Sequence, residues 1–109
     1  MSYNIVFTPF FEREFKKLFK KYNSLKNDFA TVVDELKDNP RSGESIGSNC
    51  YKIRMSISSK NKGKSGGARV ITYVRFVEEE IHLIAIYDKS ELSNIAEEQL
   101  LIRIRSVRQ

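Results

Sequence analysis

At 109 residues the chain has the size of one domain, so we expect residues 1–109 to fold around one hydrophobic core. Hydrophobic residues make up 40% and charged residues 30%, a balance that excludes an intrinsically disordered chain. A lone cysteine, Cys50, excludes an internal disulfide and favours a reducing compartment. With no signal-peptide pattern and no apolar run of membrane-spanning length, the sequence predicts a cytoplasmic protein without a membrane partner.

Positive charge is concentrated in the middle of the chain. The net charge is +5, yet the stretch from Ser45 to Val77 contains no acidic residue and seven basic ones. The rest of the chain has 12 basic and 14 acidic residues, a balance of −2. A concentrated basic region attracts polyanions, of which nucleic acid is the first candidate.

The first half of the sequence predicts a strand followed by a helical hairpin. Residues 3–8 are largely β-branched or aromatic, and Thr8 can cap a helix whose first turn holds Pro9. Two stretches with apolar residues at helical spacing follow, separated by a break at Asn23-Ser24. Their apolar stripes are Phe11, Phe15, Leu18, Phe19 and Tyr22, then Leu25, Phe29, Val32, Val33 and Leu36.

A sheet and a last helix are predicted after the turn-rich residues 41–49. The segments CYKIRMSI, ARVITYVRFV and IHLIAIYD predict a meander, in which the last, nearly all-apolar strand lies inside the sheet. Ser93 or Asn94 is the expected cap of the last helix, with a capping box to Glu97. The order of elements predicts an α+β fold: an antiparallel sheet of about four strands, helices on one face, and part of the other face free.

Basic side chains converge in this sheet. Alternation puts Lys52 and Arg54 on one face of their strand, and Arg69 joins them, also facing solvent, if the two strands pair. Crowded cations lower the pKa of a lysine, while arginine stays charged and can stabilise a pentacoordinate phosphorane. The residue pattern leaves open a phosphate-binding surface without chemistry.

Two loops supply further candidates. The segment KNKGKSGGAR combines Lys60, Lys62 and Lys64 with glycines that allow close approach to a phosphate chain, although a solvated hairpin loop is equally compatible. After the last strand, Lys89 and Glu91 could reach the same face, or form an ion pair and a solvated turn. One histidine and one cysteine are too few for a zinc-type centre, so we expect no metal and no cofactor.

The run K-x-R, the basic loop ending SGG-x-R, and IY-x-K-x-E-x-S over residues 51–95 resemble toxins of the RelE/ParE superfamily, most closely its HigB/RelE-like branch. That resemblance implies a RelE-like fold and a toxin of a toxin–antitoxin system that cuts mRNA on the ribosome without a metal and inhibits translation. It also implies a cognate antitoxin, expected to be a small helix-turn-helix protein encoded adjacently.

The same resemblance assigns roles. Lys52 is the candidate base, and Arg54 and Arg69 stabilise the phosphate and the transition state. The other catalytic candidates are Lys89 and Glu91. The candidate contacts to RNA or the ribosome are Lys60, Lys62, Lys64, Arg75 and Tyr73. Some members have an arginine at the position of Ser90 and a tyrosine near Ala96, so the general acid stays open between Glu91 and Tyr87.

Two other functions remain compatible with the sequence. A ParE-like toxin of the same superfamily would inhibit gyrase, but it has no need for clustered cations on a strand face. A non-catalytic RNA-binding module would need aromatic side chains for base stacking on the open face, where only Tyr73 is available.

Overall fold

The computed structural model describes residues 3–61 and 63–108 and has the predicted α+β fold. Its elements in chain order are β1 (Asn4–Phe7), α1 (Pro9–Lys21), α2 (Leu25–Asp38), β2 (Glu44–Gly47), β3 (Cys50–Met55), the 3-10 turn η1 (Ser58–Lys60), β4 (Ala68–Arg75), β5 (Glu80–Asp88) and α3 (Glu97–Arg108).

The sheet has five strands in the order β1-β5-β4-β3-β2. The predicted meander of β3, β4 and β5 is confirmed, and β5 lies inside the sheet between β1 and β4. The expectation of about four antiparallel strands is corrected in two respects. Part of the connector pairs with β3 as the edge strand β2, and β1 runs parallel to β5.

The start of α1 follows its sequence signals. Thr8 is the N-cap residue, its Oγ1 accepts a hydrogen bond from the amide of Phe11 at 3.3 Å, and Pro9 occupies the first turn. The Thr8 hydroxyl also donates to the carbonyl of Leu83 at 2.7 Å. This cap therefore attaches the helix to β5 as well as starting it.

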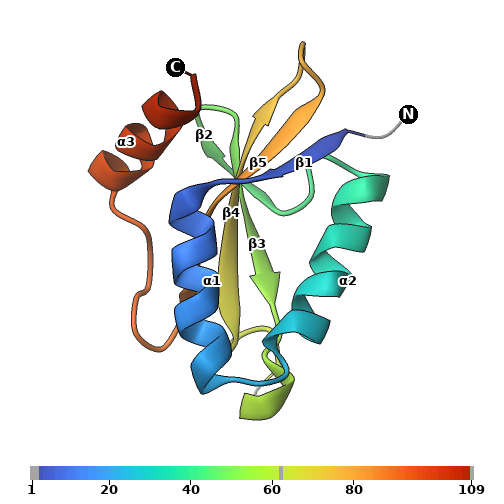
Figure 1. Cartoon of the computed structure of the whole chain (residues 1–109), viewed down its shortest axis with the longest axis vertical. Coiled ribbons are helices and arrows are strands. Elements are labelled where there is room, and N and C mark those ends of the chain that lie inside the picture. The colour runs from blue at the N-terminus through green and yellow to red at the C-terminus, as the bar shows by residue number, and fades with distance from the viewer. Residues whose placement is uncertain (1–2, 62, 109) are drawn as a thin grey trace.

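Helices cover both faces of the sheet, and the expectation that they share one face is wrong. The hairpin of α1 and α2 lies in front of the sheet in Figure 1, and its apolar stripes pack on side chains such as Ile53, Val70 and Leu83. On the other face Leu100 and Ile104 of α3 pack on a second apolar cluster that includes Ala85. The strand β5 is buried on both faces, so each face needs a cover.

The start of α3 also differs from the prediction. The helix begins at Glu97, so neither Ser93 nor Asn94 is its cap. The side-chain oxygen of Asn94 instead accepts a hydrogen bond from the ammonium of Lys52 at 3.1 Å. The segment between β5 and α3 therefore lies against the edge of the candidate site.

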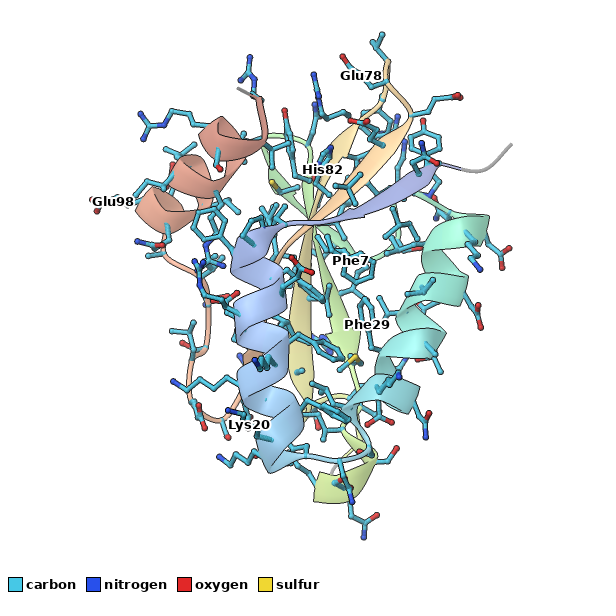
Figure 2. The ribbon with its side chains drawn as sticks, viewed as in Figure 1. Phe7, Lys20, Phe29, Glu78, His82 and Glu98 are labelled. Carbon is cyan, nitrogen blue, oxygen red and sulfur yellow. The ribbon has the colours of Figure 1, made fainter. Side chains whose placement is uncertain are left out.

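An apolar groove of about 440 Å³ opens between β1, α1 and α2, lined by phenylalanines. Phe7 and Phe29, labelled in Figure 2, pack edge to face with ring centroids 6.0 Å apart, and 47% of Phe7 is exposed. None of the described helices is long and apolar enough to cross a membrane.

Candidate functional site

Cationic and aromatic side chains form a row across β3, β4 and β5, near the end of these strands where the basic loop joins the sheet. Arg54 of β3 is directly opposite Arg69 of β4, and Arg69 is directly opposite Tyr87 of β5. Burial lowers the pKa of Arg69, and the neighbouring charge of Arg54 lowers it further. Burial raises the pKa of Tyr87, against smaller opposing effects of the backbone at Ile95 and of Arg69. The predicted convergence of the two arginines is present.

Arg69 differs from Arg54 in exposure. Arg54 is exposed, whereas only 4% of Arg69 is accessible, so the expectation of a solvent-facing Arg69 is wrong. The Arg69 guanidinium donates hydrogen bonds to the carbonyls of Lys64 at 2.9 Å, Ala68 at 3.1 Å and Ser65 at 3.5 Å. It is buried because it closes the end of the basic loop onto the sheet.

Lys52 and Lys89 are held by adjacent residues of one segment. The Lys52 ammonium donates to the side chain of Asn94 at 3.1 Å, and the Lys89 ammonium donates to the backbone carbonyl of Ser93 at 3.3 Å. Lys52 also lies 3.8 Å from Glu44. The segment after β5 thereby contacts both lysines.

An open cleft of about 440 Å³ joins Lys52 and Arg54 to Lys64 of the basic loop. Glu35, Gly43, Glu44 and Ile53 complete its lining. Within residues 3–61 and 63–108, no carboxylate lies within ion-pair distance of Arg54 or Lys64. An anion entering this cleft would meet cations from two parts of the chain.

The basic loop is anchored, in contrast to a solvated hairpin loop. The backbone amide of Ser58 donates to Asp28 at 2.8 Å, and Ser59 exchanges hydrogen bonds with Ser24, so α2 holds the start of the loop. The Lys60 ammonium pairs with Asp88 at 2.8 Å on the face of the sheet that α1 and α2 cover, and 10% of the Lys60 side chain is exposed. This position opposes the predicted RNA contact by Lys60, and Lys62 lies outside the described residues.

Glu91, Arg75 and Tyr73 lie away from the row of cations. Glu91 forms an exposed ion pair with Lys21 of α1 at 2.9 Å. Arg75 is at the opposite end of β4 and pairs with Glu78 and Glu80 (3.2 and 3.5 Å). In Figure 2 the labelled Glu78 marks the tip of the turn at that end.

Tyr73 is also unsuited to base stacking in this structure. Only 8% of the residue is accessible, and its ring lies 6.4 Å from that of His82 within the apolar cluster under α3. Of the two general acids left open by the sequence, Tyr87 lies in the row and Glu91 does not.

Sequence reasoning missed Asp88, the buried partner of Lys60. Its carboxylate is fully buried and accepts hydrogen bonds from Lys60, Tyr22 and Ser90. Burial alone would raise the pKa of Asp88, but these hydrogen bonds prevail and hold it well below its usual value. The available signal was an acidic residue directly after the apolar run from Leu83 to Tyr87.

No metal centre is evident in the part of the chain that the structure describes, where no three His, Cys, Asp or Glu side chains cluster as ligands. His82 contacts Glu80 at 3.0 Å. Burial raises the pKa of the Cys50 thiol to about 12, so at neutral pH it is not a thiolate nucleophile or ligand.

Comparison with known proteins identifies the family. Residues 8–105 match the family model described as the RelE toxin of the RelE/RelB toxin–antitoxin system. Solved structures share the fold at low identity. A double mutant of the Escherichia coli toxin RelE in the free state is 18% identical, with a TM-score of 0.63 over 98% of this chain and 99% of that chain.

Two solved toxin–antitoxin complexes are also similar. In the intact E. coli RelBE complex the matched chain is 20% identical, with a TM-score of 0.62 over 80% of this chain and 96% of that one. In the RelBE2 complex of Mycobacterium tuberculosis the matched chain is 18% identical, with a TM-score of 0.56 over 81% of this chain and 99% of that one. Assignment to the HigB-like branch stays a prediction. Because the family model spans almost the whole sequence and the fold agrees, the chain belongs to the RelE toxin family.

Proposed function

We propose that this toxin cuts mRNA on the ribosome without a metal ion and thereby inhibits translation. The observation that carries the proposal is the direct pairing of Arg54 with Arg69, next to a cleft that also contains Lys52 and Lys64. Neighbouring like charges are unfavourable unless an anion neutralises them, and a phosphodiester supplies that charge. Membership of the RelE toxin family supports RNA as the source of the phosphate.

The proposed chemistry needs only groups of the RNA and of the protein. The ribose 2′-oxygen attacks the adjacent phosphorus, the bond to the 5′-oxygen breaks, and the products end in a 2′,3′-cyclic phosphate and a 5′-hydroxyl. Lys52, acting as the neutral amine after losing its own proton to solvent, takes the 2′-hydroxyl proton, and Arg54 and Arg69 stabilise the charge of the phosphorane. Tyr87, which lies opposite Arg69 in the row, is our candidate for returning a proton to the leaving oxygen. The Lys89 ammonium, held by the turn after β5, would add positive charge to the site.

The proposed partners are mRNA, the ribosome and a cognate antitoxin. Lys64, and Lys62 from the same loop, would contact the RNA or ribosome backbone. Two of the similar solved structures are toxin–antitoxin complexes, which supports an antitoxin partner for this chain. We expect that antitoxin to be a small helix-turn-helix protein encoded next to the toxin.

The test is primer extension on mRNA bound to purified ribosomes, with the toxin first treated with EDTA and dialysed so that only the ribosomes receive magnesium. We expect new 5′-hydroxyl ends within the ribosome-bound codon and none on free mRNA. Inhibition of gyrase supercoiling without mRNA cleavage would replace the proposal with the ParE-like alternative. Ribosome binding with neither activity would indicate a non-catalytic RNA-binding module, and loss of cleavage after EDTA treatment would contradict metal independence.

A further inference from the structure

The fully buried carboxylate of Asp88 connects three segments of the chain close to the candidate site. Oδ1 of Asp88 accepts hydrogen bonds from the Lys60 ammonium at 2.8 Å, the Ser90 amide at 2.9 Å and the Ser90 hydroxyl at 2.7 Å. Oδ2 accepts from the Tyr22 hydroxyl at 2.7 Å. The end of α1, the start of the basic loop and the turn after β5 therefore meet at one residue, at the lower end of the molecule in Figure 1.

The partner ammonium is held almost as firmly as the carboxylate. Only 10% of the Lys60 side chain is exposed, and its Nζ lies 5.6 Å from the centroid of the Tyr22 ring and 3.3 Å from the Ser90 hydroxyl. A lysine in the middle of a basic loop is thus turned toward the helices, whereas Lys64 of the same loop is exposed at the cleft.

The carboxylate lies on the face opposite the row of cations. Asp88 follows Tyr87 in β5, and successive strand side chains point to opposite faces. Asp88 is also opposite Ala68, next to the pairing of Arg69 with Tyr87, and the amide of Lys89 donates to the carbonyl of Gly67 at 3.0 Å. Asp88 therefore cannot contact RNA that is bound over Arg54 and Arg69. Its backbone does lie next to the backbone of Arg69 and of Lys89.

We propose that Asp88 and Lys60 form a positioning pair that fixes the basic loop and the Lys89 turn relative to Arg54 and Arg69 during mRNA cleavage. This inference rests on the proposed function. A buried ion pair adds little net stability compared with apolar residues of similar volume, but it fixes the geometry of the groups it connects. Removing one partner leaves the other charge buried without a counter-ion and destabilises the fold. In protein that is still folded, the rate of the chemical step should fall more than ribosome binding does.

The test compares single-turnover cleavage by the parent, Asp88→Asn and Lys60→Met on programmed ribosomes, at a temperature where circular dichroism shows each protein folded. Misplaced catalytic groups should lower the maximal rate roughly 10- to 100-fold. The half-saturating ribosome concentration should change less than about 2-fold, because ground-state binding is retained. The double variant should be no slower than the slower single variant, since both substitutions remove the same interaction.

Two further variants separate positioning from general damage. Lys60→Arg keeps a cation opposite Asp88 and should recover most of the rate lost in Lys60→Met. Lys21→Ala breaks the exposed ion pair between Lys21 and Glu91, a residue of the turn after β5, and this variant should cleave at the parent rate. Parent-like cleavage by folded Asp88→Asn and Lys60→Met would overturn the proposal. So would equal loss of rate and binding, or failure of both variants to fold.

Amide hydrogen exchange provides a readout that does not need cleavage. In Asp88→Asn and Lys60→Met, the amides of Lys60, Asn61 and Lys89 should exchange faster than in the parent, while amides in the middle of β4 stay protected. If the parent protein cuts no mRNA, the proposed function fails, and faster exchange would still establish the pair as the anchor of the loop. Unchanged exchange would show that the pair fixes nothing.

Discussion

The two ends of β4 each present an arginine, and the structure treats them in opposite ways. Arg75, at the end near the turn, pairs with Glu78 and Glu80. Arg69, at the loop end, is opposite Arg54, and within the described ranges neither has a carboxylate within ion-pair distance. In Figure 1 these ends point to the top and the bottom of the molecule.

This difference shows that basic residues in one stretch of sequence need not form one surface. Acidic residues of the turn between β4 and β5 neutralise one end of the strand, so it has no excess charge to offer a phosphate. At the loop end of β4 the acidic residue is Asp88, which lies on the face opposite the cations. Lys60 pairs with it there and so does not reach the cleft. Of the cations left on the site face, Arg54 and Arg69 have no carboxylate within ion-pair distance in the described ranges, and Lys52 has only Glu44, at 3.8 Å.

The largest expected effect is on cleavage. Arg54→Ala should lower the rate on programmed ribosomes by about 100- to 1,000-fold, because an exposed guanidinium that stabilises the transition state is removed. Arg75→Ala is the matched control from the other end of the hairpin and should cleave within about 3-fold of the parent, since its charge is already paired. Similar losses in both variants would erase the distinction between the two ends.

Much of the fold could be predicted because its signals are local. The cap at Thr8, the apolar stripes of both hairpin helices and the alternation around Lys52 and Arg54 depend on residues near one another in sequence. The strand β2 was missed because it has only four residues, with one apolar side chain, Ile46, and it ends on a glycine, so it resembles a turn. The parallel pairing of β1 was missed because nothing local indicates that Asn4 pairs with Glu80, 76 residues away.

The candidate site was only partly predictable for the same reason. Pairing of Arg54 with Arg69 follows from a hairpin and was foreseen, whereas the burial of Arg69 depends on how its loop folds back. The ion pair of Lys60 joins residues 28 positions apart on different elements, and no spacing rule indicates it. The acidic run after β4 could have suggested that Arg75 is neutralised.

The next effect in size concerns stability and compares Arg69 with Arg75, the two arginines at the ends of β4. Arg69→Ala should lower the free energy of unfolding by about 1.5–3 kcal/mol, because it removes hydrogen bonds of a charged donor and leaves loop carbonyls without it. Arg75→Ala should lower it by less than about 1 kcal/mol, as expected for ion pairs that remain accessible to solvent. Urea denaturation followed by circular dichroism measures both, and equal losses would mean that Arg69 does not anchor the loop.

The smallest expected effect is in the acid stability of the loop end. The hydrogen bonds to Asp88 depress its pKa in the folded state, so the folded protein binds fewer protons there than the unfolded chain. The resulting stabilisation is fully present above the unfolded-state pKa of about 3.9 and is lost as the pH falls from there toward the folded value. Asp88→Asn has no such carboxylate, so its unfolding free energy should vary less between about pH 5 and pH 2.

Asp34→Asn is the control, because Asp34 is an exposed carboxylate on α2. Urea denaturation at a series of pH values should give it the parent's pH dependence, while the parent and Asp88→Asn converge in acid as protonation removes the charge that distinguishes them. Asp28, whose pKa the hydrogen bonds of Ser58 and Ser24 lower despite burial, contributes in the same direction and is unchanged in both variants. A difference between the parent and Asp88→Asn that stays constant across this range would mean that the Asp88 charge does not stabilise the loop end, and that its hydrogen bonds serve equally well when the group is neutral.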